Sequence, residues 1–222
     1  YMKQIKIAPS MLSADFSIFG QEVKSITEAG ADLLHLDVMD GSFVKNISFG
    51  PKFIKEARPY SNGVFDAHLM ILNPWKYIDR FVDAGADIIT VHKEACGDNL
   101  LNVLKQIKSL GVKCGAVINP DTSVDSIRDV IEYCDMILLM SVFPGFGGQK
   151  FMESSLDKIK YLKEQKELNN YKYIIEVDGG INQSTAALVK KAGCEAVVAG
   201  TYLFKSDNFT NAVKGLKEIC VE

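Results

Sequence analysis

The chain reads Glu28-Ala-Gly-Ala-Asp-Leu-Leu-His-Leu-Asp37 near its start, and residues 83–92 and 191–200 repeat the same pattern. Each stretch combines the end of an amphipathic segment with a glycine, a small residue, an acidic residue and an apolar run. The glycine suits the left-handed cap that ends many helices, and the apolar run predicts a strand buried on both faces. The three stretches therefore predict helix-to-strand junctions of a parallel sheet.

Eight strands are predicted by working outward from these junctions. They cover residues 5–8, 33–38, 64–69, 88–92, 114–118, 136–140, 174–177 and 196–199. Amphipathic helices are predicted between them, over residues 19–29, 51–57, 74–84, 100–110, 123–133, 156–165 and 184–192. Such alternation in 222 residues predicts an α/β fold, and we expect residues 2–222 to form a single (β/α)8 TIM barrel domain. A doubly wound open sheet is the alternative, and the lack of a Gly-x-Gly-x-x-Gly motif after the first strand disfavours it.

Composition excludes several classes of partner. The 25 basic and 28 acidic residues leave a formal net charge of -3, so no global positive field attracts nucleic acid or anionic membranes. The longest apolar runs, such as Met136–Met140, are far shorter than the roughly 20 residues that span a bilayer. No signal-peptide pattern stands at the N-terminus, so we expect a cytoplasmic protein without nucleic-acid or membrane partners. The five cysteines are widely spaced and form no Cys-x-x-Cys motif, which predicts reduced thiols.

Four polar side chains stand where predicted strands end, which is where a barrel places its reactive groups. His35 and Asp37 share one face of the second strand, His68 ends the third, and Asp178 ends the seventh. Any one of them alone is more often a core histidine or a turn residue. Together they form a mixed nitrogen and oxygen set suited to one divalent metal ion: zinc, Fe(II) or manganese.

Five further residues lie at the same predicted strand ends. His92 and Glu94 are weaker candidates, for which we expect a supporting or structural role beside the ligands. Met39, Met70 and Met140 end three different strands. Methionine usually fills cores, but an apolar floor at a barrel mouth could also shield a reactive intermediate from water.

Glycine-rich turns follow the sixth, seventh and eighth predicted strands. They are Pro144-Gly-Phe-Gly-Gly-Gln149, Gly179-Gly180 and Gly200-Thr201. A single glycine pair usually serves only a tight turn, but three such turns at successive strand ends predict a cup of backbone N–H groups for a phosphate. The long loop after the sixth strand is also a candidate lid.

A metal ion, two carboxylates and a phosphate cup together suggest proton abstraction beside the carbonyl of a sugar phosphate, through an enediolate. Asp37 and Asp178 on opposite faces of the reacting carbon would epimerise it, whereas the same residues on one face would suit aldose–ketose isomerisation. A barrel that binds a sugar phosphate without converting it is a third hypothesis. The two carboxylates argue against it, because a binding protein needs only the phosphate cup.

Six short blocks resemble the signature blocks of the ribulose-phosphate 3-epimerase family. They are Ile7-Ala-Pro-Ser10, Leu36-Asp-Val-Met-Asp-Gly41, His68-Leu-Met70, Asn119-Pro-Asp-Thr122, Pro144-Gly-Phe-Gly-Gly-Gln149 and Val177-Asp-Gly-Gly-Ile181. The resemblance covers essentially the whole chain. It implies a barrel of the ribulose-phosphate binding type that interconverts D-ribulose 5-phosphate and D-xylulose 5-phosphate in the pentose phosphate pathway of carbohydrate metabolism.

The resemblance also implies roles for individual residues. The metal ligands would be His35, Asp37, His68 and Asp178, and the two aspartates would exchange the roles of proton acceptor and donor. Ser10 and His68 would contact the sugar. Further substrate contacts would come from Gly145, Phe146, Gly147, Gly148, Asp178, Gly179, Gly180, Gly200 and Thr201. Barrels of this size often self-associate, so a homo-oligomer is also expected.

Three positions depart from the family pattern. Ser42 stands where the family usually has histidine, Lys45 where it has proline, and Phe143 where it has asparagine. Because they flank the mouth and not the metal residues, they bear on sugar specificity. The related D-allulose-6-phosphate 3-epimerases, which form D-fructose 6-phosphate, share the metal and acid–base residues. They are the alternative, and the intact glycine turns favour the pentose phosphate.

Overall fold

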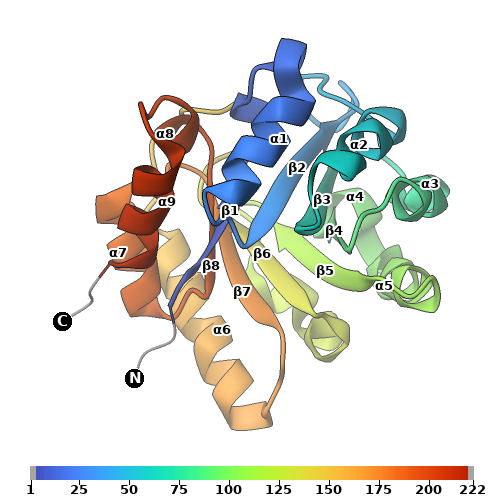
Figure 1. Ribbon diagram of the computed structural model, residues 1–222. Helices are drawn as coiled ribbons and strands as arrows, with labels where there is room; N and C mark the ends of the chain where they lie inside the picture. The colour runs from blue at the N-terminus through green and yellow to red at the C-terminus, as the bar shows by residue number, and fades with distance from the viewer. Residues whose placement is uncertain (1–3, 220–222) are drawn as a thin grey trace.

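Eight parallel strands form one curved sheet with the helices on its outside (Figure 1). The structure, a computed structural model, describes residues 4–219. The strands are β1 (Lys6–Pro9), β2 (Leu33–Met39), β3 (Val64–Met70), β4 (Ile88–His92), β5 (Lys113–Ile118), β6 (Met136–Met140), β7 (Ile174–Asp178) and β8 (Ala196–Ala199). The expected domain limits at residues 2 and 222, and Cys220, lie outside the described residues.

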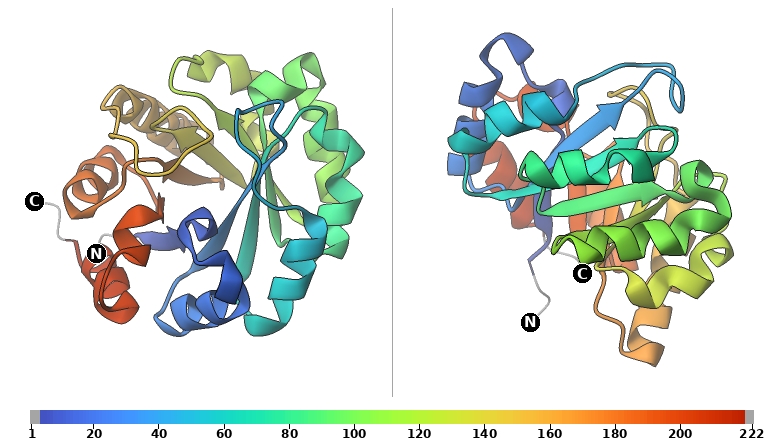
Figure 2. Two further views of the ribbon diagram at one scale, coloured as in Figure 1. Left: turned by 90° about the horizontal axis from the view of Figure 1, so that it is seen from above. Right: turned by 90° about the vertical axis from the view of Figure 1, so that its right-hand side faces the viewer.

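The two ends of the sheet meet and close a barrel. Its hydrogen-bonded order is β1-β8-β7-β6-β5-β4-β3-β2, which leaves β1 and β2 as the edges. Ser10 forms a parallel bridge with His35, and the backbone N–H of Asp32 donates to the carbonyl of Ile7 at 2.9 Å. In the left view of Figure 2 the helices ring the strands. The predicted (β/α)8 barrel is therefore confirmed.

The helices follow the strands as the sequence periodicity predicts, with additional short turns. The α-helices are α1 (Phe19–Glu28), α2 (Pro51–Ala57), α3 (Ile78–Asp83), α4 (Lys93–Cys96), α5 (Leu100–Ser109), α6 (Ser155–Asn169), α7 (Gln183–Ala192), α8 (Thr201–Phe204) and α9 (Phe209–Lys217). The 3-10 helices are η1 (Met11–Ser13), η2 (Phe16–Ile18), η3 (Arg58–Tyr60), η4 (Pro74–Lys76), η5 (Gly97–Asn99) and η6 (Val124–Tyr133).

Three regions differ from the predicted helices. Residues 74–84 divide into η4 and α3, and residues 124–133 form the 3-10 helix η6. The apolar residues Val124, Ile127 and Val130 recur every three residues, which is the period of a 3-10 helix. After β8, α8 and α9 occupy a region for which no helix range was predicted.

The predicted helix-to-strand junctions are confirmed by their backbone. Gly30, Gly85 and Gly193 adopt φ values of 96°, 94° and 118°, in the left-handed region that glycine enters without strain. All seven residues of β2 are buried, as expected for a strand between a barrel interior and an outer helix layer.

The barrel interior changes from apolar to polar along its axis. Ala8, Leu33, Ile88, Met136 and Val198 form an apolar cluster inside the barrel. Inward-facing residues nearer the carboxyl ends of the strands are polar, and they form the site described below. Within residues 4–219, no helix has the length and apolar character needed to cross a membrane.

Candidate functional site

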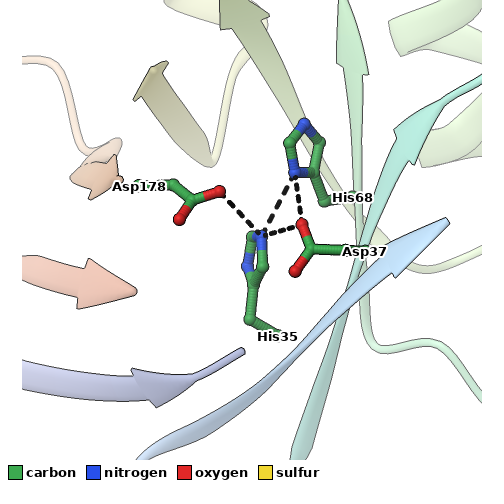
Figure 3. Close-up of side chains that lie close together, drawn as sticks. All are labelled: His35, Asp37, His68 and Asp178. Atoms are coloured by element: carbon green, nitrogen blue, oxygen red, sulfur yellow. Dashed lines mark hydrogen bonds and ion pairs between the residues drawn. The ribbon is translucent and has the colours of Figure 1, made fainter. Parts of the chain in front are cut away.

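Strand alternation brings four polar side chains to the carboxyl end of the barrel interior. His35 and Asp37 are two residues apart on β2, so both point inward. His68 on β3 is the register partner of Asp37, and Asp178 is the last residue of β7. Figure 3 shows the four side chains pointing toward one another.

The potential ligand atoms of these residues all lie within 4.8 Å of one another. His35 Nε2 is 3.3 Å from Asp37 Oδ1, 3.2 Å from His68 Nδ1 and 3.9 Å from Asp178 Oδ2. His68 Nδ1 is 3.2 Å from Asp37 Oδ1. In Figure 3, Asp37 and Asp178 reach His35 from different strands, β2 and β7.

This donor set fits a divalent metal ion. Two imidazole nitrogens and two carboxylate oxygens are ligands that zinc, Fe(II) and manganese accept. Asp66 Oδ2 lies 2.7 Å from His35 Nδ1 and so takes the proton of that nitrogen in a hydrogen bond. In a neutral His35 the lone pair on Nε2 then faces the carboxylates of Asp37 and Asp178. A cation bound between these three electron-donating groups would stabilise them.

The two aspartates differ strongly in acidity. Although burial opposes ionisation, the neighbouring His35 and His68 hold the pKa of Asp37 far below its usual range. Burial and the nearby charge of Asp37 raise the pKa of Asp178 to about 7. Although burial also opposes the charged form of His35, Asp37 and Asp66 raise its pKa well above the usual value. A protonated His35 would partly offset the negative charge of these neighbouring carboxylates.

Two further acids lie behind His35, inside the barrel. Asp66 precedes His68 by two residues and Glu176 precedes Asp178 by two, so all four share the inward face of their strands. Glu176 is fully buried, and neither of its carboxyl oxygens has a hydrogen-bond partner among residues 4–219. Burial and the charge of Asp66 raise the pKa of Glu176 well above its usual value. Burial and the charge of Asp66 therefore both favour the protonated form of Glu176.

His92 and Glu94 extend the cluster in the other direction. His92 Nε2 lies 2.8 Å from His68 Nε2, and His92 Nδ1 lies 3.1 Å from Glu94 Oε2. Burial lowers the pKa of His68 to about 4 and also lowers the pKa of His92. Although partial burial opposes ionisation, hydrogen bonds from His92, Thr122 and the Asn119 backbone lower the pKa of Glu94 to about 2. His92 and Glu94 therefore lie behind the candidate ligand His68, which is the supporting position that the sequence predicts for them.

A pocket lies at the carboxyl ends of the strands, with Asp37 and Asp178 in its wall. The other predicted site residues in its lining are Ser10, Met39, Met70, Met140, Gly145, Phe146, Gly147, Gly148, Gly179, Gly180, Gly200 and Thr201. His35 and His68 are fully buried and do not line it. His68 therefore joins the ligand cluster but not the pocket surface.

The three methionines split between two apolar clusters at the pocket. Met39 and Met70 are register partners and pack with Val44. Met140 packs with Val142 and its neighbours. All three line the pocket, which agrees with the expected apolar floor.

The three glycine turns come together at the pocket. A Cβ on Gly200 would lie only 2.5 Å from Ser13 Oγ, whereas one on Gly148 would make an ordinary contact with Thr201 Oγ1 at 3.7 Å. The loop after β6 thus approaches the segments that follow β1 and β8. Glycines of all three turns therefore line one side of the pocket, where the phosphate cup is predicted.

Several lining residues were not predicted as individual substrate contacts. They are Leu12, Ser13, Val142, Phe143, Pro144, Gln149, Ile181, Val198 and Tyr202. Most are sequence neighbours of predicted residues, so adjacency to a strand end was the available signal. For Asp66 and Glu176 the signal was their position two residues before a candidate ligand.

The three departures from the family pattern lie in different places. Phe143 is 48% exposed and lines the pocket. Ser42 and Lys45 are exposed in the loop after β2 and do not line it. In that loop, Asn46 Nδ2 donates to the Gly145 carbonyl at 2.7 Å, which ties the loop to the one after β6. Phe143 is therefore the departure best placed to contact a ligand.

Sequence comparison finds relatives over nearly the whole chain. Residues 6–204 match the family described as the ribulose-phosphate 3 epimerase family. A ribulose-phosphate 3-epimerase of Synechocystis sp. is 47% identical, with 97% of this chain and 94% of the relative covered. One of Bacillus subtilis is also 47% identical, with 96% and 98% covered.

Solved structures show the same fold in more distant proteins. KGPDC from Streptococcus mutans matches with a TM-score of 0.73 at 13% identity, over 97% of both chains. A 3-hexulose-6-phosphate synthase matches with a TM-score of 0.69 at 16% identity, over 98% of this chain and all of that one. These likenesses concern the fold alone.

Proposed function

Because the chain belongs to the ribulose-phosphate 3-epimerase family, we propose that it interconverts D-ribulose 5-phosphate and D-xylulose 5-phosphate. The resemblance carried by six sequence blocks is thus confirmed at the level of the family, and the chain is an enzyme of the epimerase class. The observation that most supports the two-carboxylate reaction is that Asp37 and Asp178 bring two carboxylates from different strands to one cluster around His35 (Figure 3).

Asp37 is suited to accept the proton from C3 of the sugar, and Asp178 to donate one. Their environments push the two pKa values apart, Asp37 far down and Asp178 to about 7, which is the arrangement that separates a base from an acid. Removal of a proton from one face of C3 and return of a proton to the other face invert the carbon. The roles exchange when the reaction runs in reverse.

The surrounding residues hold these carboxylates in place. Ser10 Oγ donates to Asp37 Oδ2 at 2.6 Å, which leaves Asp37 oriented toward the cluster. The residues that would hold a metal ion are His35, Asp37, His68 and Asp178. When bound, a divalent cation would stabilise negative charge that develops on the sugar oxygens. Met39, Met70 and Met140 would exclude water above it.

The substrate phosphate would bind where the glycine turns meet. Gly147, Gly148, Gly179, Gly180 and Gly200 line that side of the pocket. Short α8 starts there with Thr201, and the first N–H groups of a helix have no partner within it. Backbone N–H groups can therefore neutralise the phosphate without a basic side chain.

The alternative functions have less support. The curated relatives carry the ribulose-phosphate name, which favours the pentose over D-allulose 6-phosphate. A barrel that only binds a sugar phosphate would not need Asp37 and Asp178 around one buried cluster. A place in the pentose phosphate pathway, a cytoplasmic location and self-association stay predictions.

The test incubates metal-loaded protein with D-ribulose 5-phosphate in D₂O. Deuterium at C3 and formation of D-xylulose 5-phosphate are the expected results. D-Allulose 6-phosphate, assayed in parallel, ranks the two sugars by kcat/KM. Absence of both exchange and product would overturn the proposal.

A further inference from the structure

We infer that His92 and Glu94 are positioning residues that select the metal-binding tautomer of His68. The three residues are called the relay below. The inference rests on the metal site of the proposed function but not on the sugar. It concerns a ring nitrogen that lies on the far side of His68 from the other candidate ligands.

The relay begins at a carboxylate whose oxygens only accept hydrogen bonds. Glu94 Oε1 accepts the backbone N–H of Asn119 at 2.8 Å and the hydroxyl of Thr122. Its other oxygen, Oε2, lies 3.1 Å from His92 Nδ1. Since a carboxylate has no proton to give, His92 Nδ1 must be the donor.

The donor and acceptor roles then propagate to His68. A neutral His92 that carries its proton on Nδ1 has a lone pair on Nε2. His68 Nε2, 2.8 Å away, must therefore donate to it. The ring planes are inclined by only 23° and the centroids are 5.0 Å apart, so the N–H of one ring points along the lone pair of the other.

The consequence reaches the metal cluster. With its proton on Nε2, neutral His68 presents a lone pair at Nδ1, the atom 3.2 Å from both His35 Nε2 and Asp37 Oδ1. The opposite tautomer would place a proton at Nδ1 and block metal binding there. Asp66 does the corresponding work for His35, so each histidine ligand has its own carboxylate.

At the outer end of the relay, a lysine fixes the loop that contacts Glu94. The ammonium of Lys158, at the start of α6, donates to the carbonyls of Asn119, Pro120 and Thr122 at 3.0, 2.7 and 2.6 Å. These contacts fix the loop that binds Glu94. His68 and His92 are fully buried, and the Glu94 side chain is 23% exposed, so water competes only at the far end.

Glu94→Gln tests the relay because the change is isosteric. The backbone N–H of Asn119 can only donate, so the amide oxygen must face it and the amide NH₂ must face His92. His92 would then carry its proton on Nε2, and His68 would carry its proton on Nδ1. His92→Phe is the second variant, because it removes the acceptor for His68 Nε2 without introducing a new proton.

The readout is the tautomer itself. The chain has only three histidines, so ¹⁵N-labelled imidazoles can be assigned in the metal-free protein at neutral pH. We expect the Nε2–H form of His68 in the wild type and the Nδ1–H form in Glu94→Gln. Zinc affinity, measured by chelator competition, should fall about 10- to 100-fold in Glu94→Gln and in His92→Phe.

Glu195→Gln is the matched control. Like Glu94, Glu195 accepts a backbone N–H, here that of Ile175, and it also pairs with Lys166, but it lies at the amino end of β8, away from the metal cluster. It should change zinc affinity less than about threefold, as expected for a carboxylate that does not touch a ligand. An unchanged His68 tautomer in Glu94→Gln, or zinc affinity equal to the control, would overturn the inference.

These measurements use zinc and no sugar phosphate. A negative D₂O assay would overturn the epimerase proposal, but it would not change the conclusion about the His68 tautomer. Conversely, a protein that epimerises with an unchanged His68 tautomer in Glu94→Gln would retain its proposed function and lose only the relay.

Discussion

Asp66 Oδ2 lies 2.7 Å from His35 Nδ1, on the side of the imidazole opposite Asp37 and His68. The contact directs His35 Nε2 to the metal cluster. Asp66→Asn keeps the shape but removes the charge, so zinc affinity should fall about 10- to 100-fold in chelator competition. Asp87→Asn is the control, because Asp87 accepts a hydrogen bond from the backbone N–H of Phe65 before β4 and does not contact the metal cluster. Equal losses in both variants would contradict a specific effect on His35.

The two aspartates should be needed for turnover and not for anion binding. Asp37→Asn and Asp178→Asn each remove a proton carrier, so kcat should fall by about 10²- to 10⁴-fold. Binding of inorganic phosphate, measured by calorimetry, should stay close to wild type because the phosphate cup is elsewhere in the pocket. Substantial turnover in either variant would overturn the assigned roles.

Stability of the metal-free protein should depend on pH through Asp178. Its folded-state pKa is about 7, above the ordinary value of 3.8, so the folded state holds more protons between these values. Stability from this group is present at low pH and is lost as pH rises toward 7. The side chain introduced by Asp178→Asn cannot ionise, so the variant does not lose this stability. Its free energy of unfolding, measured relative to that of the metal-free wild type, should therefore rise by on the order of 1–3 kcal/mol between pH 4 and pH 7.

Thermal unfolding of metal-free wild type and Asp178→Asn between pH 4 and 8 measures this difference. Zinc should reduce the pH dependence of the wild type, because the cation stabilises the ionised carboxylate. Parallel curves for the two metal-free proteins would contradict a raised pKa at Asp178.

Gly200 should be needed for phosphate binding because of its close approach to Ser13. In Gly200→Ala the new Cβ would meet Ser13 Oγ at 2.5 Å and push the β1 and β8 loops apart. If this displacement removes one hydrogen bond to the charged phosphate, KM should rise about tenfold or more. The value of kcat should change less. Gly50→Ala is the control, since a Cβ on Gly50 meets nothing within 4 Å. A KM equal to that of Gly50→Ala would argue against the assigned place of the phosphate.

The sequence by itself determined the strands, the barrel and the identity of the four candidate ligands. Apolar runs after glycine caps are local signals, and the bounds predicted for β4, β6 and β8 coincide with the observed ones. Strand alternation also decided that His35 and Asp37 share the interior face. The sequence did not predict that residues 124–133 form a 3-10 helix. Apolar residues at every third position suit a 3-10 helix but also fit the apolar face of an α-helix, so the pattern indicated a helix without indicating which kind.

Only the tertiary structure decided how these residues meet. The meeting of Asp37 on β2 with Asp178 on β7 depends on closure of the sheet through β1, which no local pattern encodes. The contact of His92 with His68 and the hold of Asn119 and Thr122 on Glu94 join separate strands and loops. Alternation assigns a side chain to a face, but its partners depend on barrel register and loop conformation. The direction of each hydrogen bond, and hence the chemistry, therefore emerges only in three dimensions.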